Sequence, residues 1–317
     1  MSGWYSAHLI LVQGTFISLL LATSLQVPLR TGVFSFAGIG SYGIGAYVAA
    51  IVTIRYEWPA LLALAAAVAA PIVVSYLLAL LVARLNGLYL AMATIAFDLI
   101  LAVVAINGGD LTGGPTGLYG ALSNVQTYQV ALVCLVVVVL LAISERGRTG
   151  RRVDAVREDP ELAVSLGVPV VRMRRLAFVV GGALGGCAGG MNALLRTTVS
   201  PDDVGFSLVV LALTIIIVGG VRSWAGALIG AVIFTWLPSV LQVVGQWQTL
   251  VYGVLVALAA VWVPEGLLGL VQDGVSRLGR RWRPEQVGPG SAAADEGPDD
   301  GSQDQLLALQ TPAGDGP

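Results

Sequence analysis

The stretch GGALGGCAGGMNALL, residues 181–195, carries three glycine pairs spaced four residues apart. It lies in a longer apolar run, residues 174–195, which as a helix rising about 1.5 Å per residue can cross about 30 Å of hydrocarbon. The spacing aligns the glycines in two ridges, along which neighbouring backbones can approach closely. We therefore expect a tightly packed membrane-spanning helix; the alternative is that its smooth ridges let helices slide or hinge. The glycines selected for packing are Gly45, in a similar ridge of residues 33–54, and Gly182, Gly186 and Gly190.

The composition extends this prediction to most of the chain. Of the 317 residues, 56% are hydrophobic and 11% are charged, and the mean hydropathy is +0.83. Soluble domains are nearer a quarter charged. The composition therefore predicts a membrane protein.

Missing residue types exclude several chemistries. All 17 basic residues are arginine, so the chain has no lysine for a P-loop, a Schiff base or a kinase site. The single histidine, His8, excludes an HExxH pair and a multi-histidine metal site. Cys134 and Cys187 lie in apolar runs, where buried thiols are expected. We therefore expect no metal site, no catalytic residues and no ATPase site.

Nine apolar runs are long enough, or nearly long enough, to cross a membrane. The sequence thus predicts an all-α fold, a polytopic transmembrane helix bundle of about nine spans within a range of about eight to ten. The runs cover residues 8–29, 33–54, 59–83, 87–106, 127–144, 174–195, 206–220, 224–241 and 247–263.

The seventh and eighth runs form one nearly continuous apolar stretch, residues 206–237. A single helix of that length would measure about 48 Å, which is too long for one ordinary crossing. Glycine releases a helix and arginine seeks water. We therefore expect a break at Gly219, Gly220, Arg222, Ser223 and Gly226.

The arginine positions orient these runs. Residues 145–175 hold eight of the 17 arginines, which places this loop in the cytoplasm by the positive-inside rule. With nine crossings, 15 of the 17 arginines lie on that side, and Arg55 and Arg196 lie outside. Merging the seventh and eighth runs would send four C-terminal arginines outward. We therefore expect nine crossings, an outside N-terminus and a cytoplasmic C-terminus.

The charges also divide the chain into regions. Residues 1–271 are predicted to be the transmembrane domain, and residues 272–284 a basic juxtamembrane segment. Residues 285–317 contain seven acids and no arginine, with too few apolar residues to offset the entropy of ordering. This last region is expected to be a disordered, acidic cytoplasmic tail.

Asp98 lies near the middle of the fourth run, where a charged side chain costs about 2.5–3.5 kcal/mol on insertion scales. It should therefore not face lipid. Thr94, one turn earlier, shares its helix face. Two interpretations stay open: a protonated or hydrogen-bonded aspartate that ties this helix to a neighbour, or a polar site on a permeation route.

The loop GRTGRRVDAVREDPELAVSLGVPVVRMRR, residues 147–175, predicts a short polar helix. Asp159 can cap it, Pro160 can take its first position, and Glu161 adds favourable charge at that end. Gly167 is expected to end it. Attraction to lipid headgroups accounts for the arginines without a further function. A helix here is also what a membrane domain needs to receive force from a soluble motor.

Part of this loop, GRRVDAVREDPELAVSLGV at residues 150–168, resembles the cytoplasmic segment of permeases from ABC importers for branched-chain amino acids. The similarity is to the LivM-type branch of the LivH/LivM permease family. Residues 32–50, GVFSFAGIGSYGIGAYVAA, resemble the glycine-rich second span of that family. Further similarities follow in order at residues 84–101, 112–118, 200–210, 218–231 and 263–270.

Some positions depart from the family pattern. The family often has Gly-His-Ala where this chain has Ala37, Gly38 and Ile39, and often has Glu where Asp98 stands. Arg222 occupies a position that is usually small. Sister permeases for urea, short amides and sugars share much of the scaffold. These remain alternatives to branched-chain or other hydrophobic amino acids as the solute.

The resemblance implies a multi-pass permease subunit of the bacterial cytoplasmic membrane. The implied partners are a second, LivH-like permease subunit, two cytoplasmic ATP-binding subunits and an extracytoplasmic solute-binding protein, besides the small-molecule substrate and membrane lipid. No nucleic acid is expected, and no cofactor, because the partner subunits bind ATP. The resemblance also implies a coupling helix between spans five and six, made of Arg157, Glu158, Asp159, Glu161, Ala163 and Gly167, and a substrate pathway with Ser41, Thr94 and Asp98 as candidates.

Other classes of protein fit the residues less well. An ion-coupled secondary transporter or channel would need more than one titratable group inside the membrane, and Asp98 is the one convincing example. An intramembrane enzyme would need paired catalytic groups at bilayer depth. A structural scaffold would leave the polar loop at residues 145–175 unexplained.

Overall fold

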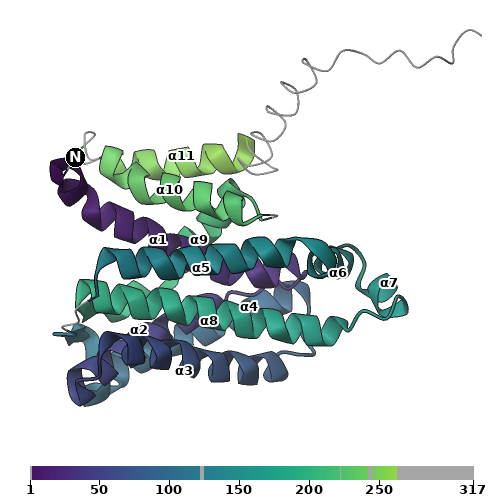
Figure 1. Cartoon of the computed structure of the whole chain (residues 1–317), viewed down its shortest axis with the longest axis horizontal. Helices are drawn as coiled ribbons and strands as arrows, with labels where there is room; N and C mark the ends of the chain where they lie inside the picture. Colours follow the sequence, from purple (N-terminus) through teal and green to yellow (C-terminus); the bar gives the residue numbers. More distant parts are fainter. Residues whose placement is uncertain (1, 122–124, 222, 242–244, 246, 263–317) are drawn as a thin grey trace, which may run out of the picture. The chain divides into compact units, whose positions relative to one another are not determined.

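The computed structural model describes residues 2–121, 125–221, 223–241, 245 and 247–262, all within one compact unit, Met1–Gln272. The predicted basic segment at residues 272–284 and the acidic tail at 285–317 lie outside the described residues. The described chain is almost entirely helical (Figure 1). Its longer helices are α1 (Ser2–Arg30), α2 (Ala37–Tyr56), α3 (Ala60–Leu81), α4 (Gly87–Asn107), α5 (Thr127–Glu145), α6 (Gly147–Glu158), α8 (Val170–Arg196), α9 (Phe206–Gly219), α10 (Trp224–Leu241) and α11 (Gln248–Trp262).

Each of the nine predicted apolar runs falls on one helix, so the predicted polytopic all-α bundle is confirmed. By length and composition, seven of the described helices can cross a membrane. Helix α9 has 14 residues and so measures about 21 Å, which is less than the hydrocarbon thickness of about 30 Å. Helix α11 has 15 residues. The number of crossings, nine, therefore stays a prediction.

The predicted break between the seventh and eighth runs is confirmed, because α9 ends at Gly219 and α10 begins at Trp224. Gly220 turns the chain with a φ of 114°, a conformation that glycine adopts without steric cost. The two helices pack as an antiparallel hairpin, in which Gly219 lies against Gly226 and Gly230 lies against Ile215.

Helix α8 is the central element of the bundle and packs against α1, α2 and α3. Among the described residues, 78% of its most apolar 18-residue stretch is buried, whereas the corresponding figure for α5 is 11%. The apolar outer surface of α5 is therefore available to lipid or to another protein.

The glycine ridges of α8 meet two different neighbours. The backbone carbonyls of Gly38 and Tyr42 on α2 lie against Gly185 and Gly189. The other ridge faces α3, where a Cβ on Gly186 would lie 2.5 Å from the carbonyl oxygen of Ala67. Gly45 of α2 packs on the backbone of Gly186, Gly182 packs on Ser75, and Gly190 packs on Ala67. The four glycines selected for packing thus lie where a neighbouring helix leaves no room for a Cβ: backbone atoms are nearest at Gly45 and Gly186, and small side chains are nearest at Gly182 and Gly190.

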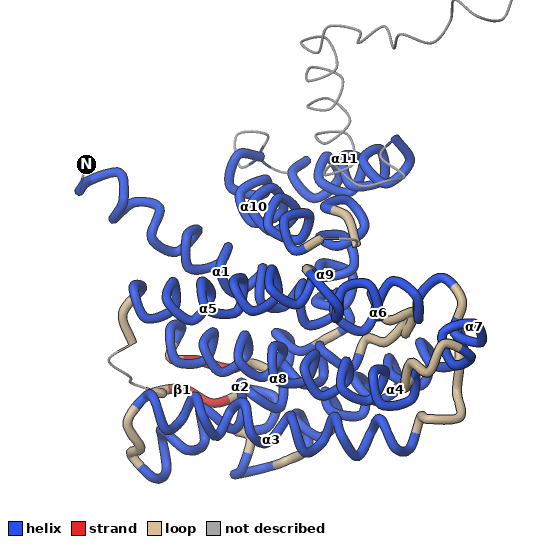
Figure 2. Tube along the Cα trace, turned by 45° about the vertical axis from the view of Figure 1, so that its right-hand side comes forward, coloured by secondary structure: helices blue, strands red, loops and turns tan. Residues whose placement is uncertain are grey.

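Short elements connect the helices at the end opposite α6. The 3-10 helices are η1 (Gly109–Leu111), η2 (Gly114–Thr116) and η3 (Pro201–Val204). Strands β1 (Leu118–Tyr119) and β2 (Thr198–Val199) pair antiparallel, with Leu118 opposite Val199. Figure 2 shows β1 at the end of the bundle away from α7 (Pro160–Ser165). The connections before α5 and after α8 therefore meet at one end.

We predict that Gly186→Ala lowers the free energy of unfolding by about 1–3 kcal/mol, because the added methyl group forces α8 away from α3. Thermal unfolding of the purified protein in detergent measures this change. The matched control is Gly253→Ala on α11, where a Cβ would meet no atom within 4 Å. Equal destabilisation by the two substitutions would contradict the packing argument.

Candidate functional site

The buried polar pair of α4 binds the first turn of α2. The backbone N–H of Gly40 donates to Oδ1 of Asp98 at 2.9 Å, and that of Phe36 donates to Oγ1 of Thr94 at 3.0 Å. Thr94 and Asp98 are 0% and 3% exposed. The first N–H groups of a helix have no acceptor within it, and this end attracts negative charge. Helix α4 thus supplies acceptors that α2 lacks.

This geometry supports the interpretation of Asp98 as a tie between helices. A Cβ on residue 40 would lie 2.5 Å from Oδ1 of Asp98, so glycine is needed for the approach. The second oxygen, Oδ2, is buried and has no hydrogen-bond partner among the described residues. A role of Asp98 and Thr94 on a permeation route stays a prediction.

Ser41 follows Gly40 but faces a different helix. Its hydroxyl donates to the carbonyl of Ala37 at 2.8 Å and lies 3.0 Å from Oγ of Ser75 on α3. Ser41 is 1% exposed. The structure therefore brings all three predicted pathway residues close to the first turns of α2, each inside a helix–helix contact.

The short helix predicted in the large loop is confirmed as α7. Oδ1 of Asp159 accepts from the backbone N–H groups of Glu161 and Leu162 at 2.9 and 3.0 Å, and Pro160 is the first helical residue. Gly167 has a φ of 78°, and the N–H of Val168 donates to the carbonyl of Ala163 at 2.9 Å. This glycine-dependent closure of a helix end is common.

Helix α6 precedes α7 and was not predicted. Its residue Val156 packs with Ala163 of α7 and Val170 of α8 in a small buried cluster, which gives the loop a core of its own. One sequence signal for α6 was available: Val153 and Val156 are apolar residues spaced three apart in a polar segment, a spacing that places them on one face of a helix. Of the residues expected to couple, Ala163 is buried, and Arg157, Glu158, Asp159, Glu161 and Gly167 are exposed.

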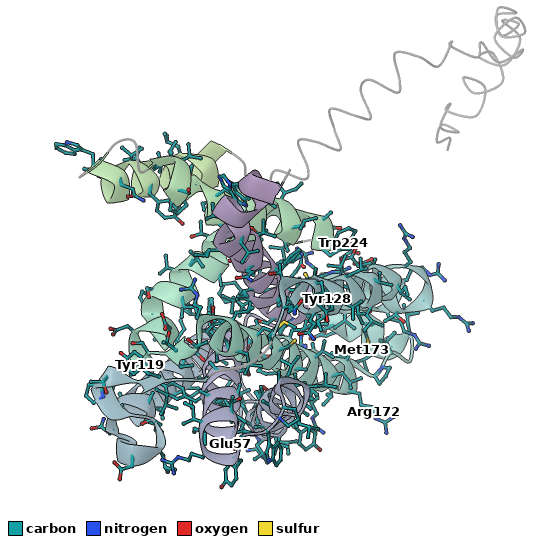
Figure 3. All side chains as sticks on the ribbon, turned by 60° about the vertical axis from the view of Figure 1, so that its left-hand side comes forward. Glu57, Tyr119, Tyr128, Arg172, Met173 and Trp224 are labelled. Carbon is teal, nitrogen blue, oxygen red and sulfur yellow. The ribbon has the colours of Figure 1, made fainter. Side chains whose placement is uncertain are left out.

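A polar cluster around Glu145 was also missed by the sequence analysis. One carboxylate oxygen, Oε1, accepts from the guanidinium of Arg30 and from the backbone N–H of Trp224, both at 2.8 Å. Nε2 of Gln26 donates to the carbonyls of Val221 and Ser223 at 3.2 and 2.7 Å. Trp224, labelled in Figure 3, begins α10. The cluster therefore fixes the α9–α10 turn to the ends of α1 and α5.

A cavity of about 370 Å³ lies toward the opposite end of the bundle. Helices α1, α2, α8, η3, α9 and α10 all contribute to its wall. Its volume is in the range of small-molecule sites, about 300–1,000 Å³. The three predicted pathway residues are not among those that line it.

For Asp98 we predict different outcomes for Asp98→Asn and Asp98→Leu. The asparagine oxygen can still accept from Gly40, whereas leucine leaves that N–H buried without a partner, at a cost of about 1–3 kcal/mol. Thermal unfolding should show a larger loss for leucine than for asparagine. Equal losses would argue against a hydrogen-bonding role.

Comparison with known proteins agrees with the resemblance noted above. Residues 7–260 match the family described as "Branched-chain amino acid transport system / permease component". No solved structure matches the chain significantly.

Individual relatives include the high-affinity branched-chain amino acid transport system permease protein LivM of Salmonella typhimurium, which is 28% identical over 312 residues, or 86% of this chain and 72% of the relative. LivM of Escherichia coli is 29% identical over 297 residues, covering 81% of this chain and 69% of the relative. LivH of Escherichia coli is 26% identical over 165 residues, covering 51% of this chain and 53% of the relative. Because the family match extends over most of the 317 residues, the chain belongs to the permease component family of branched-chain amino acid transport systems.

Proposed function

We propose that this chain is one permease subunit of an ABC importer, and that it moves branched-chain amino acids across the bacterial cytoplasmic membrane. The observation that carries the proposal is the family match over residues 7–260. The helices of membrane-spanning length support a multi-pass membrane subunit. Relatives named LivM and LivH are both permease proteins of such transport systems, which supports a second, LivH-like permease as partner.

The energy for transport comes from separate subunits in this proposal. The chain has no lysine, so it cannot form the phosphate-binding loop of an ATPase. Two cytoplasmic ATP-binding subunits would hold the ATP, and an extracytoplasmic binding protein would deliver the solute. No cofactor is needed in this chain.

The α6–α7 unit is the surface proposed to receive the ATPase. Figure 1 shows it at one end of α5 and α8. Its buried cluster joins α6 and α7 to Val170 of α8, so the unit can transmit force to that helix. Its surface combines the charges of Arg157, Glu158 and Glu161 with three apolar side chains of the α7 region, Leu162, Val164 and Leu166, which are 57%, 60% and 71% exposed. Exposed apolar side chains rimmed by charge are typical of protein contact surfaces.

We predict that charge reversal at both acids, Glu158→Arg with Glu161→Arg, lowers ATP-driven leucine uptake at least about tenfold, since a loss of about 1.4 kcal/mol in docking weakens association tenfold. Uptake by membrane vesicles and copurification of the ATPase subunits measure the effect, with the amount of inserted protein determined in parallel. The control, Asp110→Arg, alters an exposed acid of η1 at the other end. Undiminished uptake would count against this coupling surface.

The proposed orientation puts α6, α7 and the C-terminus in the cytoplasm. We expect a reporter that is active only in the cytoplasm to be active when fused to Pro317, because nine crossings start from an outside N-terminus. The same reporter inserted in the η1–η2 connection should be inactive. Activity there, or inactivity at Pro317, would contradict the orientation.

A further inference from the structure

The cavity of about 370 Å³ contains polar groups that the fold itself does not satisfy. Tyr42 and Asn192 line it and are only 4% and 7% exposed. Within the described part of the chain, neither side chain forms a hydrogen bond, and neither has a fully buried polar atom left without a partner, so their polar atoms are open to the cavity. Ligand pockets carry a small number of polar groups that fix the orientation of the ligand. Tyr42 and Asn192 can therefore supply hydrogen bonds to a ligand in the cavity.

Both signs of charge also reach this cavity. Asp202 and Asp203 on η3 line it, and so does Arg196 at the end of α8. Among the described residues, no salt bridge joins Arg196 to either aspartate. The Ser200 N–H donates to Oδ2 of Asp203 at 3.1 Å and holds that carboxylate, and the backbone N–H of Asp202 donates to Oγ of Ser200 at 3.3 Å. Arg196, Asp202 and Asp203 are exposed side chains, and charges of both signs beside one cavity suit a ligand that itself carries both signs.

The remainder of the wall is largely apolar. Its larger apolar side chains come from α1, α9 and α10: Ile17, Leu21, Leu208, Leu211, Ile215 and Phe234. Removal of an aliphatic side chain from water into such a wall is favourable by about 25 cal/mol per Å². The cavity thus combines a charged rim, hydrogen-bonding groups and an apolar wall.

We propose that this cavity binds the transported solute as a zwitterionic aliphatic amino acid. The ammonium group meets Asp202 and Asp203, the carboxylate meets Arg196, and Tyr42 and Asn192 supply hydrogen bonds. The aliphatic side chain lies against the apolar wall. This inference rests on the proposed function, and it assigns solute binding to residues other than Ser41, Thr94 and Asp98.

The test reconstitutes the chain in proteoliposomes with its partner permease, ATPase subunits and binding protein. Uptake of radiolabelled L-leucine and hydrolysis of ATP are measured in the same vesicles, with binding protein and leucine saturating. The readout is the number of leucine molecules moved per ATP hydrolysed. A variant that is merely less stable lowers both rates together and leaves this ratio unchanged.

Each cavity substitution has a matched control on this chain. Tyr42→Phe is paired with Tyr47→Phe, because Tyr47 is on the same helix, is 8% exposed, has a hydroxyl without a partner among the described residues, and does not line the cavity. Arg196→Gln is paired with Arg55→Gln, and Asp203→Asn with Asp110→Asn. Arg55 and Asp110 are exposed residues of the same end that do not line the cavity.

We expect Tyr42→Phe to lower the ratio about threefold to tenfold, as loss of one hydrogen bond to a charged ligand would. Arg196→Gln and Asp203→Asn should lower it tenfold or more, about the loss of a charge-assisted contact. The three controls should keep the ratio of the unaltered protein. If the unaltered transporter moves leucine but the cavity variants match their controls, the cavity assignment is wrong. If the unaltered transporter moves no leucine, the proposed function itself is wrong.

Discussion

Backbone-to-backbone contact along α8 is the constraint on which the rest of the bundle depends. Lipid is as apolar as the side chains, so burial from water drives little of the association between membrane helices. Contact area must come instead from close approach, and the glycines of α8 let α2 and α3 lie directly against it. Because both neighbours are fixed to one helix, the first turns of α2 also have a fixed position. The hydrogen bonds of α4 to Phe36 and Gly40 depend on that position.

Polar side chains are concentrated where helices end inside the protein. Backbone groups at membrane depth have no water to bind, so another part of the chain must satisfy them. Asp98 does this at the start of α2, and Glu145 does it at the start of α10. In both places a carboxylate from one helix accepts from the N-terminal amide of another. The buried Asp98 and the half-buried Glu145 thus join segments that are distant in sequence.

The sequence predicted local features better than contacts between distant segments. The lengths of the apolar runs predicted the long helices, and the glycine positions predicted the break between α9 and α10. Asp159, Pro160 and Gly167 gave the bounds of α7, since capping depends on residues a few positions apart. The partner of Asp98 could not be predicted, because Gly40 is a backbone donor with no side-chain signal. Nor could the cavity, because Tyr42, Asn192 and Asp203 come together only when α2, α8 and η3 are in place.

As one of the nine predicted crossings, α9 would tie the protein to the thickness of its membrane, because the helix is short. At about 21 Å the helix is about 9 Å shorter than a typical hydrocarbon layer. Such a mismatch is accommodated by local thinning of the lipid or by association with other helices, at fractions of a kcal/mol per Å. Helices α1, α10 and α11 contact α9, so neighbouring helices, and not lipid alone, can compensate for the difference in length. If α9 does cross the membrane, bilayers with longer acyl chains would strain this corner of the bundle first.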